Sequence, residues 1–272
     1  MRGKAWNLRL LLLQLGTFLT CIFGLSCSST WRGRPMDAEQ FFSEKQLTSY
    51  RLAQQGETER LVQAVNAGVD LNLPGKEDMT LLGLAVLTAD TPAIINLMRA
   101  GANPNQVIPN AGSPAILAIT HHFNPPRTKA VSALLDGGYD PNQLLSRGTP
   151  YLFYFVDYSH WPGLELAIKR GGNINVQRKN GESLLTYLVE SSDFPQARDL
   201  ISKGADVAAR GPRGETALRE IDFKITEANP AVREGWRELL TMRELILSKL
   251  RDPEDRRSVF TDEADEKIRK NP

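Results

Sequence analysis

The side chains best suited to metal binding or nucleophilic catalysis are few in this sequence. It contains three histidines, His121, His122 and His160, and two cysteines, Cys21 and Cys27. Adjacent helical residues point about 100° apart, so a helix would not direct His121 and His122 at one ion. The chain has no nucleophile elbow, zinc-protease motif or glycine-rich phosphate loop. We therefore expect no enzyme, no metal and no other cofactor, with a hydrolase that uses these histidines as the alternative.

The first 27 residues have the pattern of an export signal that ends in a lipid anchor. A positively charged start, with Arg2, Lys4 and Arg9, precedes an uncharged and mostly apolar run over residues 10–25. Small residues then lead to Cys27, an arrangement that resembles the lipobox of bacterial lipoproteins. The apolar run is short for a membrane-spanning helix, so a retained membrane anchor or plain secretion is the weaker interpretation.

The lipobox resemblance implies that a peptidase removes residues 1–26 and that Cys27 is acylated, for example with palmitate. Several acyl chains together make a stable membrane anchor, whereas one chain binds only marginally. Ser28 follows the cysteine, and in Gram-negative lipoproteins the absence of Asp there favours the outer membrane, facing the periplasm. Cys21 is the rival lipidation site, but Thr20 before it is bulkier than the small residue usual at that place. Residues 27–36 then form a short tether.

Composition limits the kinds of partner that the remaining chain can bind. The formal net charge of the full sequence is only +1, so no strong electrostatic attraction to nucleic acid is expected. No cysteine follows Cys27, which excludes a disulfide framework or a cysteine metal site in the body of the protein.

A repeated pattern organises most of the chain. A glycine recurs at steps of 33, 37, 33 and 33 residues, followed by an Asp or Asn two residues later and usually by Asn four residues later. A Thr or Ser follows each glycine by 11 or 12 residues, immediately before an apolar run. The repeated glycines are Gly68, Gly101, Gly138, Gly171 and Gly204. Each Thr or Ser is expected to cap a first helix, and each glycine to end a second helix.

This period, with runs such as Thr80-Leu81-Leu82-Gly83-Leu84-Ala85, resembles the ankyrin repeat and its T-P-L-H-x-A motif. The resemblance implies an α-rich solenoid of about six ankyrin repeats over residues 37–250, each a helix-turn-helix with a β-hairpin finger. An N-terminal helix and a longer C-terminal helix from residue 229 to 250 would cap it. The histidine of the motif is missing from every repeat, which implies lower stability than an idealised array. Residues 251–272 hold thirteen charged residues and predict a disordered tail.

Ankyrin solenoids expose a concave surface made of finger tips and first helices. Both signs of charge alternate there in this sequence, which favours a protein partner over a phosphate backbone. Exposed Tyr and Trp next to the fourth repeat would add interface anchors. The partner-binding residues predicted in this way are Lys76, Glu77, Met79, Thr88, His121, Asp157, Tyr158, His160, Trp161, Lys179, Asn180, Glu182, Glu190, Arg213, Glu215 and Lys224.

An anchor joined to a binding surface without an active site predicts a monomer that grips another protein at the envelope. Small ankyrin lipoproteins resemble immunity proteins, which neutralise a toxin effector delivered by neighbouring bacteria. The alternative is a periplasmic scaffold that holds a resident envelope enzyme.

Overall fold

The computed structural model describes residues 30–31, 34–120 and 127–271. The chain divides into two units, Met1–Asp37 and Ala38–Pro272. The predicted signal peptide, the predicted lipidation site Cys27 and the candidate binding residue His121 lie outside the described residues.

In the first unit, β1 (Thr30–Trp31) pairs with β2 (Arg34–Pro35) in antiparallel fashion. Across the described ranges of both units, every helix is too short or too polar to cross a lipid bilayer.

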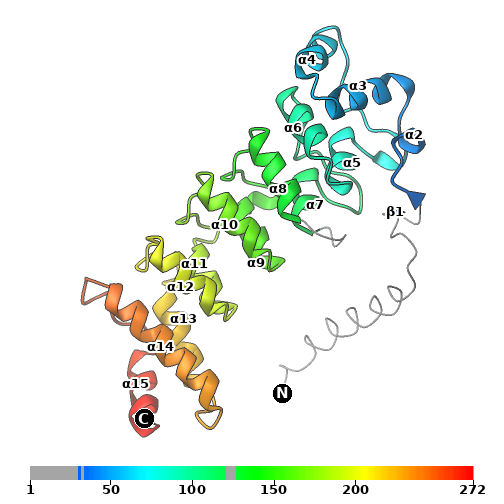
Figure 1. Ribbon diagram of the computed structural model, residues 1–272. Coiled ribbons are helices and arrows are strands. Elements are labelled where there is room, and N and C mark those ends of the chain that lie inside the picture. The colour runs from blue at the N-terminus through cyan, green and yellow to red at the C-terminus, as the bar shows by residue number, and fades with distance from the viewer. Residues whose placement is uncertain (1–29, 32–33, 121–126, 272) are drawn as a thin grey trace. The chain divides into compact units, whose positions relative to one another are not determined.

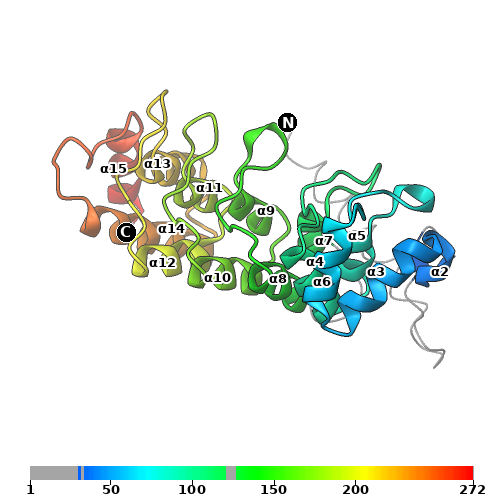
Figure 2. The same ribbon diagram turned by 90° about the horizontal axis from the view of Figure 1, so that it is seen from above.

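The second unit is a stack of helix pairs (Figure 1). Figure 2 shows the first helices of the pairs in one row and the second helices in another, with hairpin loops projecting beside the first row. The predicted solenoid of about six repeats is confirmed. A short helix α2 (Ala38–Phe41) precedes the pairs α3 (Glu44–Gln54) and α4 (Thr58–Asn66), α5 (Leu81–Leu87) and α6 (Thr91–Arg99), α7 (Pro114–Thr120) and α8 (Arg127–Asp136), α9 (Tyr151–Asp157) and α10 (Trp161–Lys169), α11 (Leu184–Glu190) and α12 (Phe194–Ser202), and α13 (Ala217–Glu227) and α14 (Arg233–Lys249).

The repeated glycine ends the second helix of each pair as predicted. All five repeated glycines have φ between 91° and 98°, the left-handed region that a side chain would strain. The backbone N–H of the following residue donates to a carbonyl in the last helical turn, as Ala102 does to Leu97 at 2.9 Å. The chain is thereby turned from the helix into the next finger.

The repeated Asp or Asn closes the turn into each finger. Asp70 Oδ1, for example, accepts a hydrogen bond from the backbone N–H of Asn72 at 2.8 Å. The second repeated Asn then reaches the next finger, because Asn72 Oδ1 accepts from the backbone N–H of Asn103 at 2.7 Å. Asn142 and Asn175 make the equivalent bond two and three repeats further along. The repeated pattern therefore fixes both the turn and the stacking of neighbouring fingers.

Three of the fingers are hairpins closed by an isolated bridge, such as that of Leu144 with Pro150. Short 3-10 turns form two of their tips, η1 (Lys76–Asp78) and η2 (Ser146–Gly148). After the fingers, Thr80 caps α5 by accepting from the N–H of Gly83, and Ser183 and Thr216 cap α11 and α13 in the same way. The fourth repeat differs from the prediction, since the N-cap residue of α9 is Pro150 rather than Thr149, and no side chain caps this helix.

The predicted disordered tail is wrong over residues 261–270, which form helix α15 (Thr261–Lys270). This helix packs on α13, where Ala264 is completely buried. Its anchor is Asp222 of α13, a fully buried carboxylate that accepts from Ser258 Oγ and Thr261 Oγ1, each at 2.7 Å. Arg243 of α14 donates from Nε to the same carboxylate at 2.6 Å. The number of charged residues in the tail predicted disorder, because composition does not include the partners that the tail finds in the preceding helices.

The start of α14, the second helix of the last pair, also differs from the prediction. Helix α14 begins at Arg233 rather than at residue 229 or 230, because residues 228–232 form a turn between α13 and α14.

Packing along the outer row of second helices is uneven. Helices α6 and α8 are in extensive contact, and α8 and α10 are in somewhat less. Among neighbouring outer helices, α10 and α12 are in the least contact. The fourth and fifth repeats are therefore the most loosely joined neighbours on the outer side.

Candidate protein-binding surface

Arg178, in the finger between the fourth and fifth repeats, organises the first-helix side of this junction. Its guanidinium lies between two aromatic rings, 4.3 Å from the centroid of Phe153 and 3.9 Å from that of Tyr187. The same group forms ion pairs with Asp157 at 3.2 Å and Glu182 at 2.8 Å. The hydroxyl of Tyr187 donates to Asp157, so α9, α11 and the finger are tied together at one point.

Carboxylates and a lysine extend this arrangement toward the sixth repeat. Burial raises the pKa of Glu182, and a hydrogen bond with the carboxyl of Glu190 raises it further. Burial also raises the pKa of Glu220 and lowers the pKa of Lys224, so both groups are partly withdrawn from water. Lys224 donates to the hydroxyl of Ser192 at 2.9 Å. A partly buried ionised group is stabilised when a further group of opposite charge binds beside it.

We call this set the ionic cluster. It spans three neighbouring repeats on the side of the first helices, and its members are Asp157, Arg178, Glu182, Tyr187, Glu190, Glu220 and Lys224.

Four predicted binding residues meet in this cluster: Asp157, Glu182, Glu190 and Lys224. At the next finger tip, the predicted residue Arg213 is exposed and pairs at 2.7 Å with Glu215, which is partly buried. Lys179 and Asn180 are exposed at the tip that follows Arg178. In the second repeat, Lys76 and Thr88 are exposed and Glu77 is half-buried.

Two predicted contact residues are wrong because their side chains are buried. Met79 is 0% exposed beneath its finger. His160 is 3% exposed, and its Nδ1 caps α10 by accepting from the N–H of Gly163 at 3.0 Å. Tyr158 is exposed as predicted, whereas Trp161 is only partly exposed and lies on the outer row, at the start of α10.

The sequence reasoning missed Arg178, Tyr187 and Glu220. A family pattern identifies the tip of each finger, but Arg178 stands one residue before the exposed tip and points back at two rings. The aromatic residues of α9 were the available signal, because a cation at the adjoining finger is well placed to stack on them.

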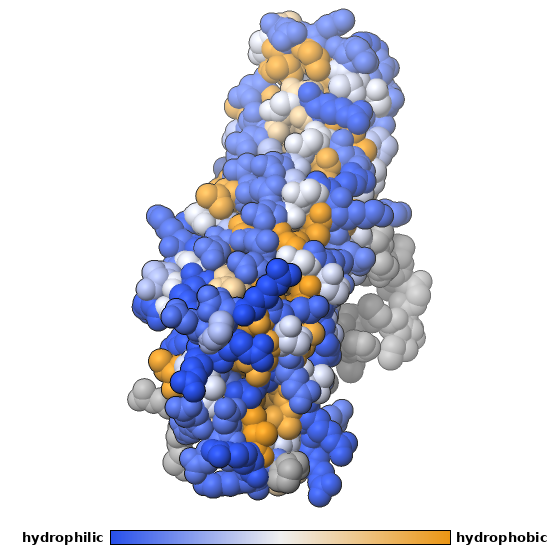
Figure 3. All heavy atoms as spheres, turned by 90° about the vertical axis from the view of Figure 1, so that its left-hand side faces the viewer, coloured by the Kyte–Doolittle hydropathy of each residue, from blue (hydrophilic) through white to orange (hydrophobic). Residues whose placement is uncertain are grey.

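In the ranges that the structure describes, His, Cys, Asp and Glu side chains nowhere gather in threes that could hold a metal ion. The face seen in Figure 3 is mostly hydrophilic, with apolar side chains in separate patches along its length.

No family model and no curated protein sequence matches this chain. Among solved structures, the chain is similar to the ankyrin repeat domain of Bcl-3, a member of the IkappaB protein family. The two are 25% identical with a TM-score of 0.54, and the match covers 75% of this chain and 86% of that one.

Two other solved structures are similar with lower TM-scores. One is the ankyrin repeat protein EF0377, at 20% identity, TM-score 0.49 and coverage of 75% and 97%. The other is a chain from the complex of the Bdellovibrio bacteriovorus predatory endopeptidase Bd0816 with immunity protein Bd3460, at 17% identity, TM-score 0.46 and coverage of 76% and 99%. The architecture of this chain is an ankyrin-repeat solenoid, and ankyrin-repeat domains are protein-interaction modules.

Proposed function

We propose that this protein is a lipid-anchored component of the bacterial envelope that binds and neutralises a toxin protein. The ionic cluster carries the binding part of the proposal. Its charged groups come from three repeats, are already held in place by one another, and remain partly open to solvent, with Asp157 at 31% and Arg178 at 23% side-chain exposure.

A protein is the partner that this surface fits best. The ionic cluster holds four carboxylates and two cations, so a complementary surface must carry both signs of charge with positive charge in excess, which a polyanionic backbone does not. Prior fixation of Arg178 by two rings and two carboxylates lowers the conformational entropy that binding would otherwise lose.

The immunity role rests on the combination of anchor and binding surface. The lipobox-like sequence ending at Cys27 would hold the protein at the membrane, where a toxin that attacks lipid or cell wall arrives. A tethered binder without catalytic groups would act by covering its target. This combination resembles that of small ankyrin immunity lipoproteins.

Partner capture by variants tests the binding surface. In a pull-down from envelope extract, Arg178→Ala should reduce the captured partner about 30-fold, the effect of losing an interface contact of about 2 kcal/mol. Arg170→Ala is the matched control, because this arginine also forms an ion pair but lies on the outer side, at the end of α10. Circular dichroism should show both variants folded. Equal capture by both variants would exclude the ionic cluster as the binding site.

A second experiment separates the immunity role from the scaffold role. The product of the neighbouring gene is expressed in the periplasm of cells with and without this protein. Survival only in its presence supports immunity. If the toxic neighbour kills both cultures equally, immunity is excluded. Capture of a resident envelope enzyme, with a stress phenotype on deletion, would then identify a scaffold.

A further inference from the structure

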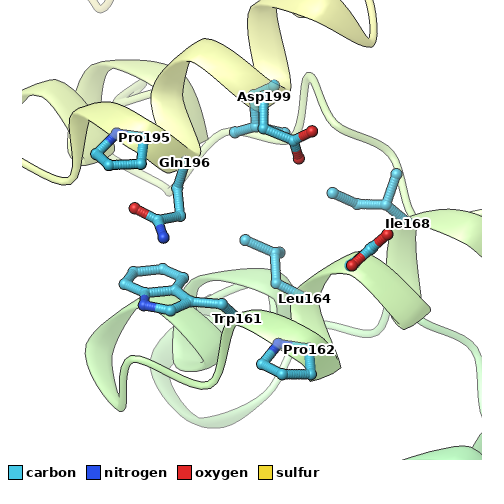
Figure 4. A pocket seen from close by; sticks show the side chains of 9 residues that line it. Trp161, Pro162, Leu164, Ile168, Pro195, Gln196 and Asp199 are labelled. Atoms are coloured by element: carbon cyan, nitrogen blue, oxygen red, sulfur yellow. The ribbon is translucent and has the colours of Figure 1, made fainter.

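The loose junction between α10 and α12 opens a groove on the outer row, away from the ionic cluster. Figure 4 shows Trp161 of α10 facing Pro195 and Gln196 of α12 across it. Its volume is about 290 Å³. Leu164 and Leu200 form its apolar floor, being 5% and 1% exposed.

The groove lies at a junction for which the structure shows a charged and aromatic link on the opposite side. Arg178 joins α9 to the finger before α11 on the first-helix side. On the outer side, both helices begin with an aromatic residue followed by proline, Trp161-Pro162 and Phe194-Pro195. Pro162 and Pro195 line the open space rather than closing it.

Carboxylates give the rim of the groove its charge. Glu165 and Asp199 both line it, one from each helix, and both are exposed. Asp199 forms an ion pair with Lys203 at 2.6 Å, but such a surface pair contributes little and exchanges readily for another cation. The rim therefore favours a basic group, and the floor favours an apolar one.

The size of the groove narrows the class of occupant. Pockets for small molecules and cofactors span about 300 to 1,000 Å³, so this groove is at the lower limit of that range. One apolar side chain on the floor, with a second side chain across the rim, would fill it.

We propose that this groove is a second docking site, which takes an extended peptide segment carrying an apolar side chain next to a lysine or arginine. The apolar side chain packs on Leu164 and Leu200 beside the indole of Trp161. The basic side chain lies between Glu165 and Asp199. The site is independent of the ionic cluster, so the protein can hold two segments at once.

Nuclear magnetic resonance of the full chain in detergent tests this site. The indole N–H signal of Trp161, assigned by its loss in Trp161→Phe, is followed during titration with acetyl-Leu-Leu-Lys-amide. The matched probe is acetyl-Leu-Leu-Glu-amide. We expect a saturable shift with the lysine peptide and at least tenfold weaker binding of the glutamate peptide.

Variants of the groove define the outcomes. Replacing both rim carboxylates, Glu165→Gln with Asp199→Asn, should bring the two peptides to within about threefold of each other, since only the floor would remain. The surface change Gln196→Trp should fill the groove and abolish the shift. Glu234→Gln, an exposed carboxylate on α14, should change nothing. Absence of a saturable shift, or equal binding of both peptides to the unaltered protein, would overturn the proposal.

Discussion

The guanidinium of Arg178 has partners of three kinds: two rings, two carboxylates and, through Asp157, a tyrosine hydroxyl. Each ring contact contributes about 0.5–1 kcal/mol at a partly exposed site, and each ion pair about as much. The planar group is needed for stacking and paired hydrogen bonding together, which a lysine ammonium cannot reproduce. One residue therefore sets the geometry of the surface that the partner would meet.

The pKa of Glu182 leads to a pH prediction at this scale. Burial and the hydrogen bond with Glu190 raise it, so the folded protein retains a proton that the unfolded chain releases above about pH 4.3. The folded state then binds more protons than the unfolded state, and stability falls as pH rises toward the raised pKa. Glu182→Gln removes this loss.

We expect the stability of Glu182→Gln, relative to the unaltered protein, to improve as the pH rises from about 4 through the raised pKa of Glu182. Urea unfolding at several pH values measures it. A difference in the free energy of unfolding that stays constant or declines with pH would contradict the prediction.

Individual side chains were the hardest features to predict. The ankyrin pattern placed Met79 on the concave surface, but its side chain is fully buried beneath the finger. His160 looked exposed among aromatic residues, yet it caps α10 and its ring lies 5.8 Å from that of Phe155. The place of a residue within the repeat predicts where its backbone lies, whereas the direction of its side chain depends on the local backbone angles.

At the scale of helices and turns, the sequence predicted more, because the chemistry there is local. Glycine at the helix end, Thr or Ser at the helix start and Asp or Asn in the turn all act within a few residues. Helix α15 escaped prediction for the opposite reason. Its anchor, Asp222, lies 39 positions before Thr261 in the chain, so no local pattern reveals the contact.

Removal of residues 251–272 should destabilise the protein, because it takes two hydroxyl donors away from the buried Asp222 and exposes the apolar side of α13. The expected decrease in the free energy of unfolding is about 2–4 kcal/mol, measured by urea denaturation. A disordered tail would instead leave stability unchanged.

The variant Asp222→Ala tests the same contact without shortening the chain. It leaves Arg243, only 11% exposed, without its buried carboxylate, so a loss of about 3 kcal/mol is expected. Agreement between the two measurements would identify Asp222 as the residue that fastens α15.

At the scale of the molecule, the repeat period identified the solenoid, since each repeat contacts mainly its neighbours. The uneven joining of repeats was not predictable. Neither the aromatic-proline starts of α10 and α12 nor the spacing of the repeats indicates that this outer pair stands apart. Such differences arise from packing between units, which a repeated sequence pattern averages out.

The proposed location of the molecule depends on Cys27. Cells grown with radiolabelled palmitate should label the unaltered protein and not Cys27→Ala, because the acylated thiol would be gone. Cys21→Ala, the change at the rival site, should remain labelled. Labelling that follows Cys21, or none in the unaltered protein, would exclude an anchor at Cys27.

Helix α15 has a consequence for how this protein could have evolved. It occupies the side of α13 on which the first helix of another repeat would stack, and its bonds to Asp222 fasten it there. A duplicated repeat added after the last pair could not pack on that side of α13, because α15 already covers it. Lengthening by gene duplication would therefore have to insert new units inside the array, where a repeated asparagine such as Asn72 can accept a hydrogen bond from the backbone of the inserted finger.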